Sequence, residues 1–253
     1  MANLLKDFLD SHEEEKPTPQ CLMRIQRDLA ELHADPPPGV FAAPEESDVS
    51  VIHAVIVGPW NTPLEGGLFH IVFKLPPDYP MRSPHAFFVT GVEAMVSFHN
   101  HIRWGNICPS AQGTYGGMSW SPAQTIGSLL VSIQSLLADG AAERMRLNAV
   151  SIAVCDTLEG CLKELPAPDA MPPPLKKQVL KYFVDNYAKY EDSVKAQIGS
   201  STGPFSWFSG NSCYEQLLQR LRYIKKEVDE KKAADGQQNN DFSLPAVTQS
   251  RQA

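Results

Sequence analysis

The sequence predicts an α+β fold, in which a four-strand antiparallel meander sheet packs against helices and a further helical segment follows. Three observations support this prediction. Apolar residues alternate in consecutive stretches between positions 49 and 90, which is the pattern of strands joined by short loops. Before and after these stretches, apolar residues recur every three or four positions, as in amphipathic helices. A proline-rich stretch at 166–174 then separates the last helices from the rest of the chain.

The composition is that of a water-soluble globular protein. The chain has 253 residues, of which 43% are hydrophobic and 20% charged, and its net charge of −7 argues against a nucleic-acid partner. No apolar run approaches the roughly 18 residues that a membrane span needs. Lys6 and Asp7 interrupt the apolar residues at the N-terminus, so no signal-peptide core is present there. We therefore expect a cytoplasmic and nuclear protein without a membrane partner, whose five cysteines are free thiols.

The N-terminal part predicts a short flexible segment and then a helix. Residues 1–17 hold a small apolar patch and a charged run, and we expect a frayed tail there, with a small amphipathic helix as the alternative. Thr18 and Pro19 are typical of an N-cap and a first helical position. The helix that follows, over 20–34, has one apolar face, formed by Leu22, Ile25, Leu29 and Leu32.

Three strands can be located from alternation. The first covers about 49–57 and is apolar on both faces, the second covers 69–75 and the third covers 85–90. The connections at 58–67 and 76–84 are rich in glycine and proline, which are typical of tight turns and stiff loops. Short connections of this kind favour antiparallel neighbours.

Residues 98–118 have no clear periodicity, and we interpret them as a long ordered loop, which in compact domains is usually functional. Cys108 lies in this loop, just after a tight turn predicted at Gly105-Asn106. Asn100, eight residues upstream, carries a side-chain amide that can donate a hydrogen bond to a developing oxyanion. A thiol with a nearby amide donor and no metal-ligand spacing indicates acyl chemistry on sulfur.

Helices are predicted through most of the remaining chain. The first spans Ser121 to Leu137, with Ser121 as its cap, and is expected to pack across the sheet. Further helices are predicted within 141–165, over 175–198, and from a capping box at Ser212 to Val228. The predicted domain boundaries are a flexible segment at 1–17, a core at 18–165, a helical C-terminal extension at 166–232 and a disordered tail at 233–253.

Four short segments, taken in order, resemble the ubiquitin-conjugating enzymes. They are Gly58 to Gly67, Pro76 to Pro80, Gly105 to Cys108 and Trp120 to Ala123, and the resemblance covers residues 20–137. The segments at 152–160 and 214–221 are similar to the C-terminal extension of the class called ubiquitin-conjugating enzyme Z. The resemblance implies the ubiquitin-conjugating core fold, charging by a ubiquitin-activating enzyme, and acceptance of ubiquitin or of a modifier made of two ubiquitin-like folds.

The resemblance also implies roles for individual residues. Cys108 matches the thioester cysteine, and Asn100 matches the asparagine that steadies the oxyanion or orders the loop. Arg24 and Arg27 match the basic helix face that binds the activating enzyme, with a solvated helix face as the alternative. Four positions match the two loops that bind ubiquitin ligases, and they are Met81, Ser121, Pro122 and Ala123. No cofactor and no metal are implied.

The sequence departs from the family pattern in two places. His99 stands where the family has a proline before the asparagine, and the acidic loop that usually follows the helix ending at Leu137 is shortened or lost at 138–143. Because that loop helps to place the acceptor lysine in relatives, its loss puts efficient transfer in doubt, but not thioester formation. A binding module that holds ubiquitin or a ligase without passing the modifier on is therefore the second hypothesis.

A thiol hydrolase, with His99 or His101 as the base, is the third hypothesis. We rank it far below the other two, because no third orienting residue is in view. Cys155 and Cys161 do not have the spacing of zinc ligands, since no second pair follows them.

Overall fold

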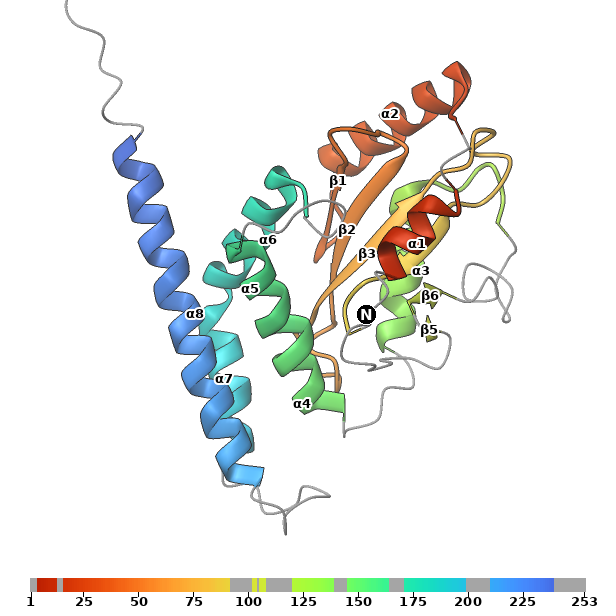
Figure 1. The fold of residues 1–253 in the computed structure, drawn as a ribbon. Coiled ribbons are helices and arrows are strands. Elements are labelled where there is room, and N and C mark those ends of the chain that lie inside the picture. The colour runs from red at the N-terminus through yellow and green to blue at the C-terminus, as the bar shows by residue number, and fades with distance from the viewer. Residues whose placement is uncertain are drawn as a thin grey trace, which may run out of the picture.

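A six-stranded sheet lies at the centre of the computed structural model, with every neighbouring pair antiparallel and the order β1-β2-β3-β4-β6-β5 (Figure 1). The structure describes residues 4–12, 16–91, 102–103, 105–107, 120–138, 145–163, 171–198 and 210–238. The strands are β1 (Val40–Pro44), β2 (Val51–Val57), β3 (Leu68–Lys74), β4 (His85–Phe88), β5 (Ile102–Arg103) and β6 (Asn106–Ile107). The first four form the predicted antiparallel meander, which is confirmed.

The hairpin of β5 and β6 was not predicted. It adds two short strands to the sheet beside β4, where Asn106 lies opposite Phe87. Strands of two residues are too short to show an alternating pattern, which explains why this stretch was predicted as loop.

Two helices cover one face of the sheet, here called the inner face: α2 (Pro19–Ala34) and α3 (Ile126–Ala138). Both place apolar stripes against inward side chains such as Ile52, Ile71 and Phe88. The predicted start of α2 is confirmed, because the Thr18 side chain accepts a hydrogen bond from the Cys21 backbone N–H with Pro19 in the first turn.

Helix α3 begins at Ile126, five residues after the predicted start at Ser121, so that boundary was wrong. The residues around Ser121 form a turn, closed by a hydrogen bond from the Gln124 N–H to the Ser121 carbonyl. Thr125 is the residue that caps the helix, since its hydroxyl accepts from the Ser128 N–H while the Ser128 hydroxyl accepts from the Thr125 N–H.

The opposite face of the sheet, the outer face, is also covered. Helix α1 (Leu4–Asp10), within the segment predicted to be flexible, packs Leu5 against Val51, Val72 and Phe87. The C-terminal helices cover the other end, where Val55 and Leu68 are buried. Because both faces are covered, β2 and β3 are buried along their entire lengths.

The C-terminal helices differ in two places from the pattern predicted. They are α4 (Arg146–Asn148), a π-helix (Ala149–Asp156), α5 (Thr157–Leu162), α6 (Pro173–Asp185), α7 (Tyr187–Gln197) and α8 (Gly210–Gln238). The single helix predicted over 175–198 was wrong, because the chain breaks at Asn186, whose side-chain amide donates to the Tyr182 carbonyl. Helix α8 continues past residue 233, where the tail was predicted to start.

Helix α7 holds the turn between β2 and β3. The Tyr190 hydroxyl donates to the Gly66 carbonyl at 2.8 Å, and the Glu65 carboxylate accepts from Ser193 at 2.5 Å and from Arg146 at 2.7 Å. Gly66 has a φ of +70°, and a Cβ there would lie 2.6 Å from the Tyr190 ring, so only glycine fits. Helix α7 of the C-terminal extension is therefore attached to the sheet by these hydrogen bonds.

None of the described helices is long and apolar enough to cross a bilayer.

A chain of three ionisable side chains lies on the outer face, with two buried histidines and a partly buried glutamate, and it predicts a pH dependence of stability. The Glu45 carboxylate lies 2.9 Å from Nε2 of His53, whose Nδ1 lies 3.0 Å from Nε2 of His70. Burial lowers the pKa of His53 to about 4 and the pKa of His70 well below its usual value, while it raises the pKa of Glu45. Both imidazoles are therefore neutral near pH 7 in the folded protein.

We expect the free energy of unfolding to fall as the pH drops below about 6.5, because unfolded histidines then bind protons that the folded ones do not. From pH 7 to pH 5 the expected loss is about 2 kcal/mol from His53 alone. Urea unfolding at both pH values measures it. His53→Gln with His70→Gln should remove most of the slope. An unchanged slope in the double variant would contradict this explanation.

Candidate functional site

The two predicted catalytic residues, Cys108 and Asn100, lie outside the described residues, and so do His99 and His101. Cys108 directly follows Ile107, the last residue of β6, in the chain. The tight turn predicted at Gly105-Asn106 is confirmed at Gly105, which lies in a turn between β5 and β6 with a φ of +82°, whereas Asn106 begins strand β6. A Cβ at Gly105 would lie 2.3 Å from the Phe87 ring, so the hairpin can approach β4 only with glycine at this position.

The predicted ligase-binding residues lie on two loops that the structure brings together. We call them the tyrosine loop, residues 76–84, and the serine loop, residues 120–125. The Trp120 indole N–H donates to the Pro80 carbonyl at 2.8 Å, which joins one loop to the other. Met81 is 70% exposed on the first loop, and Ser121, Pro122 and Ala123 are exposed on the second. These four residues are thus accessible to a partner.

The two arginines predicted to bind the activating enzyme have different environments. The Arg27 side chain is 59% exposed and lies 3.6 Å from the Glu31 carboxylate. The Arg24 side chain is 13% exposed, and it donates to the Asp28 carboxylate and to the carbonyls of Pro122 and Gln124. Of the two, Arg27 is the cation that a partner can reach.

The cysteines that the structure describes are free thiols, as predicted. Cys21, Cys155 and Cys161 are buried, and burial raises the pKa of Cys155 and of Cys161 to about 12. Their thiols are therefore protonated near pH 7 and are poor nucleophiles. Cys213 is exposed on α8. No group of side chains that can hold a metal ion occurs in the described part of the chain.

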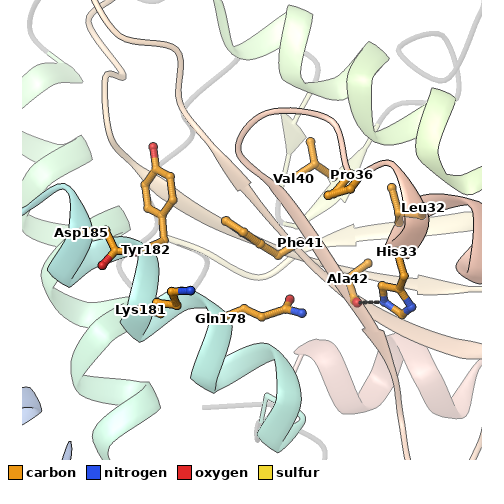
Figure 2. A pocket seen from close by; sticks show the side chains of 10 residues that line it. All are labelled: Leu32, His33, Pro36, Val40, Phe41, Ala42, Gln178, Lys181, Tyr182 and Asp185. Carbon is orange, nitrogen blue, oxygen red and sulfur yellow. Dashed lines mark hydrogen bonds between the residues drawn. The ribbon is translucent and has the colours of Figure 1, made fainter.

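A pocket of about 360 Å³ lies at the free edge of the sheet and includes none of the predicted site residues (Figure 2). Its floor is strand β1, and its walls come from the end of α2 and from α6. The His33 ring lies 3.0 Å from the Ala42 carbonyl, and Phe41 meets Tyr182 edge to face. The lining residues are Leu32, His33, Pro36, Val40, Phe41, Ala42, Gln178, Lys181, Tyr182 and Asp185.

Sequence reasoning missed two residues beside the predicted ligase-binding loops. Asp28 and Tyr79 are almost completely buried, and the Tyr79 hydroxyl donates to the Asp28 carboxylate at 2.5 Å. Burial raises the pKa of Tyr79 above its usual value, so its hydroxyl stays protonated. The one signal in the sequence was the spacing of Arg24 and Asp28, four positions apart on a helix.

Comparison with known proteins identifies the class to which this fold and these loops belong. The family described as "Ubiquitin-conjugating enzyme" matches residues 24–156. Human ubiquitin-conjugating enzyme E2 Z is 36% identical over 237 residues, which cover 86% of this chain and 66% of the human protein. Drosophila melanogaster ubiquitin-conjugating enzyme E2 N is 37% identical over 115 residues, which cover 45% of this chain and 70% of that protein.

A solved structure of human ubiquitin-conjugating enzyme E2 G1 is 30% identical, with a TM-score of 0.43, and covers 49% of this chain and all of that one. The family match covers more than half of the chain. The chain therefore belongs to the ubiquitin-conjugating enzyme family. The similarity to ubiquitin-conjugating enzyme E2 Z covers more of this chain than the family match does.

Proposed function

We propose that Cys108 accepts ubiquitin, or a ubiquitin-like modifier, from an activating enzyme and that the chain then passes it to a substrate lysine with a ligase. The Cys108 thiolate attacks the carbonyl carbon of the modifier's C-terminal thioester and expels the thiolate of the activating enzyme. A lysine amine then attacks the new thioester and expels the Cys108 thiolate. The Asn100 amide donates to the oxyanion of the tetrahedral intermediate.

The match of residues 24–156 to the family is the observation that carries this proposal. The burial of three described cysteines argues against them as alternative acceptors, and Cys213 is the exposed thiol among the described cysteines that experiment has to exclude. We also propose the cytoplasm and the nucleus as its location, since free thiols suit a reducing compartment.

Incubation with a ubiquitin-activating enzyme, ATP and ubiquitin, followed by a non-reducing gel, tests the proposal. A ubiquitin adduct that disappears on treatment with thiol is the expected result. The alternative function, a module that binds ubiquitin or a ligase without carrying a thioester, is favoured by His99 and by the short loop at 138–143, which both depart from the family pattern. Absence of an adduct, together with measurable ubiquitin binding, would support that alternative.

Arg27 provides a test of the activating-enzyme surface. We expect Arg27→Glu to slow adduct formation, and to do so more strongly at low salt, because exposed charges more than about 8 Å apart are largely screened at physiological salt. The matched control is Lys226→Glu, which makes the same charge change at a side chain that is 74% exposed on α8. Initial charging rates at several salt concentrations measure the effect. Equal rates for the two variants at every salt concentration would rule out this docking role.

A further inference from the structure

Helix α2 and the two loops that carry the predicted ligase-binding residues meet at one buried cluster. The Arg24 guanidinium donates from Nη1 to the Pro122 carbonyl at 3.0 Å and from Nη2 to the Gln124 carbonyl at 2.6 Å. These carbonyls lie on either side of Ala123 in the serine loop. The third donor of Arg24, Nε, lies 2.7 Å from the Asp28 carboxylate. One side chain of α2 therefore holds the backbone of the serine loop at two points.

Asp28 extends the cluster to the tyrosine loop. One carboxylate oxygen accepts from Arg24, and the other accepts from the Tyr79 hydroxyl at 2.5 Å. Asp28 is 1% exposed, and a carboxylate this deeply buried is costly unless its oxygens are paired. The Arg24 guanidinium also lies 5.7 Å from the centre of the Tyr79 ring. Asp28 thus links Arg24, which binds the serine loop, to Tyr79 of the tyrosine loop.

The residues next to this cluster point outward. Met81 follows Tyr79 by two positions and is 70% exposed, while Pro122 and Ala123 are exposed beside the two carbonyls that Arg24 binds. The Trp120–Pro80 hydrogen bond of 2.8 Å is a second, more superficial link between the loops. The buried cluster therefore contacts both loops directly beside their exposed residues.

We propose that Arg24, Asp28 and Tyr79 form a positioning network that holds the tyrosine and serine loops in one arrangement for a ubiquitin ligase, and that it acts on ligase binding rather than on thioester formation. This proposal rests on the proposed function for its ligase. It assigns Arg24 an intramolecular role and leaves contact with the activating enzyme to Arg27. Its members act through the backbone of the two loops, so we class them as positioning residues.

Tyr79→Phe is the first variant to test, because it removes a single hydroxyl and keeps the buried ring, and Asp28→Asn is the second. Nitroxide labels at Met81→Cys and Ala123→Cys report the distance between the loops, in a chain carrying Cys108→Ser and Cys213→Ser, whose remaining cysteines are buried. We expect one narrow distance distribution in the parent and a broadened or shifted one in both variants.

Arg82→Ala is the control, since it removes an exposed ion pair with Asp78 on the same loop, and its distribution should stay narrow. An unchanged distribution in Tyr79→Phe and Asp28→Asn would overturn the network.

Kinetics with Cys108 intact test the consequence for the ligase. Several RING-type ligase domains are first compared with the parent chain carrying a ubiquitin thioester. The probe is the domain that most strongly stimulates transfer of the ubiquitin to lysine. We expect Tyr79→Phe to raise the concentration of this domain needed for half-maximal discharge about fivefold, the effect of one lost buried hydrogen bond, with the rate at saturation and the rate of charging unchanged. The control is Arg222→Ala, which removes an exposed ion pair with Glu191 away from both loops and should shift this concentration less than twofold.

The outcomes separate the network from the proposed function. Failure of the unmodified chain to form an adduct refutes the proposed function, while the label distances still test the network. Three outcomes refute the positioning role for ligase binding when charging is normal. Tyr79→Phe could lower the rate of discharge at saturating ligase domain, or it could leave the half-maximal concentration of that domain unchanged. In the third outcome, no ligase domain stimulates discharge.

Discussion

Replacing Cys108 with alanine is expected to abolish the ubiquitin adduct completely, because the alanine side chain has no sulfur atom that can form a thioester with the modifier. Cys108→Ser leaves a hydroxyl, which is a poorer nucleophile than a thiolate and forms an oxyester. We therefore expect either no adduct from the serine variant, or an adduct that resists thiols and is removed by base. Gels run with and without a thiol, and after brief treatment with base, distinguish these results.

The structure supplies the control for this experiment. Cys213 is the exposed thiol among the described cysteines, so Cys213→Ser should form as much adduct as the unmodified chain. The buried cysteines are better changed to alanine than to serine, since a hydroxyl without a partner in the core costs free energy of folding. Persistence of the adduct in Cys108→Ala, with its loss in Cys213→Ser, would show that the loop at 98–118 has been misread.

The meander was predictable because its signals are local. Alternating apolar residues, proline-rich loops and the cap at Thr18 each act within a few positions of the chain, and the structure confirms them. The boundaries that were wrong carried false local signals. Ser121-Pro122 has the form of a helix start, yet Thr125 and Ser128 make the cap. The apolar spacing continues through Asn186 without showing the break there.

The environment of Arg24 was not predictable in the same way. Helical periodicity separates the apolar face of α2 from its polar faces, but it does not reveal which polar face another segment covers. The serine loop that covers Arg24 lies about a hundred positions away in the chain. From the sequence, Arg24 and Arg27 were therefore equally good candidates for binding the activating enzyme, and the tertiary contacts distinguish them. Cys108 and Asn100 remain predictions, since they lie outside the described residues.

Whether the C-terminal extension folds separately from the core, as the predicted boundary between them suggests, can be tested by unfolding. Cluster residues from the sheet, among them Val57 and Leu68, are buried together with residues of α6, α7 and α8, such as Phe183 and Leu221. Arg220 of α8 also donates to the Ser151 carbonyl in the π-helix and pairs with Asp156 and Glu159. Helices that share a core with a sheet in this way are expected to unfold with it.

Phe183→Ala should therefore destabilise the whole chain by roughly 3–5 kcal/mol, the usual cost of removing a buried phenylalanine ring. Phe183 is fully buried and meets the rings of Tyr187 and Tyr190, so the lost ring leaves a cavity in the shared core. Urea unfolding followed by far-ultraviolet circular dichroism and by tryptophan fluorescence measures the change. Trp60 packs against Tyr190 in the shared core, so the fluorescence is measured in a chain in which Trp60, Trp104 and Trp207 are replaced by phenylalanine. Trp120, which packs against the inner-face core, is then the only tryptophan, and we expect both signals to shift together as one transition.

The matched control is Tyr223→Ala, which removes an aromatic ring that is 61% exposed on α8 and should change stability by less than about 0.5 kcal/mol. Two separate transitions in Phe183→Ala, with the fluorescence of Trp120 unchanged while helical signal is lost, would mean that the extension folds as an independent domain. A single shifted transition would mean that the outer face of the sheet needs the extension, because Val55, Val57 and Leu68 would otherwise be exposed to water.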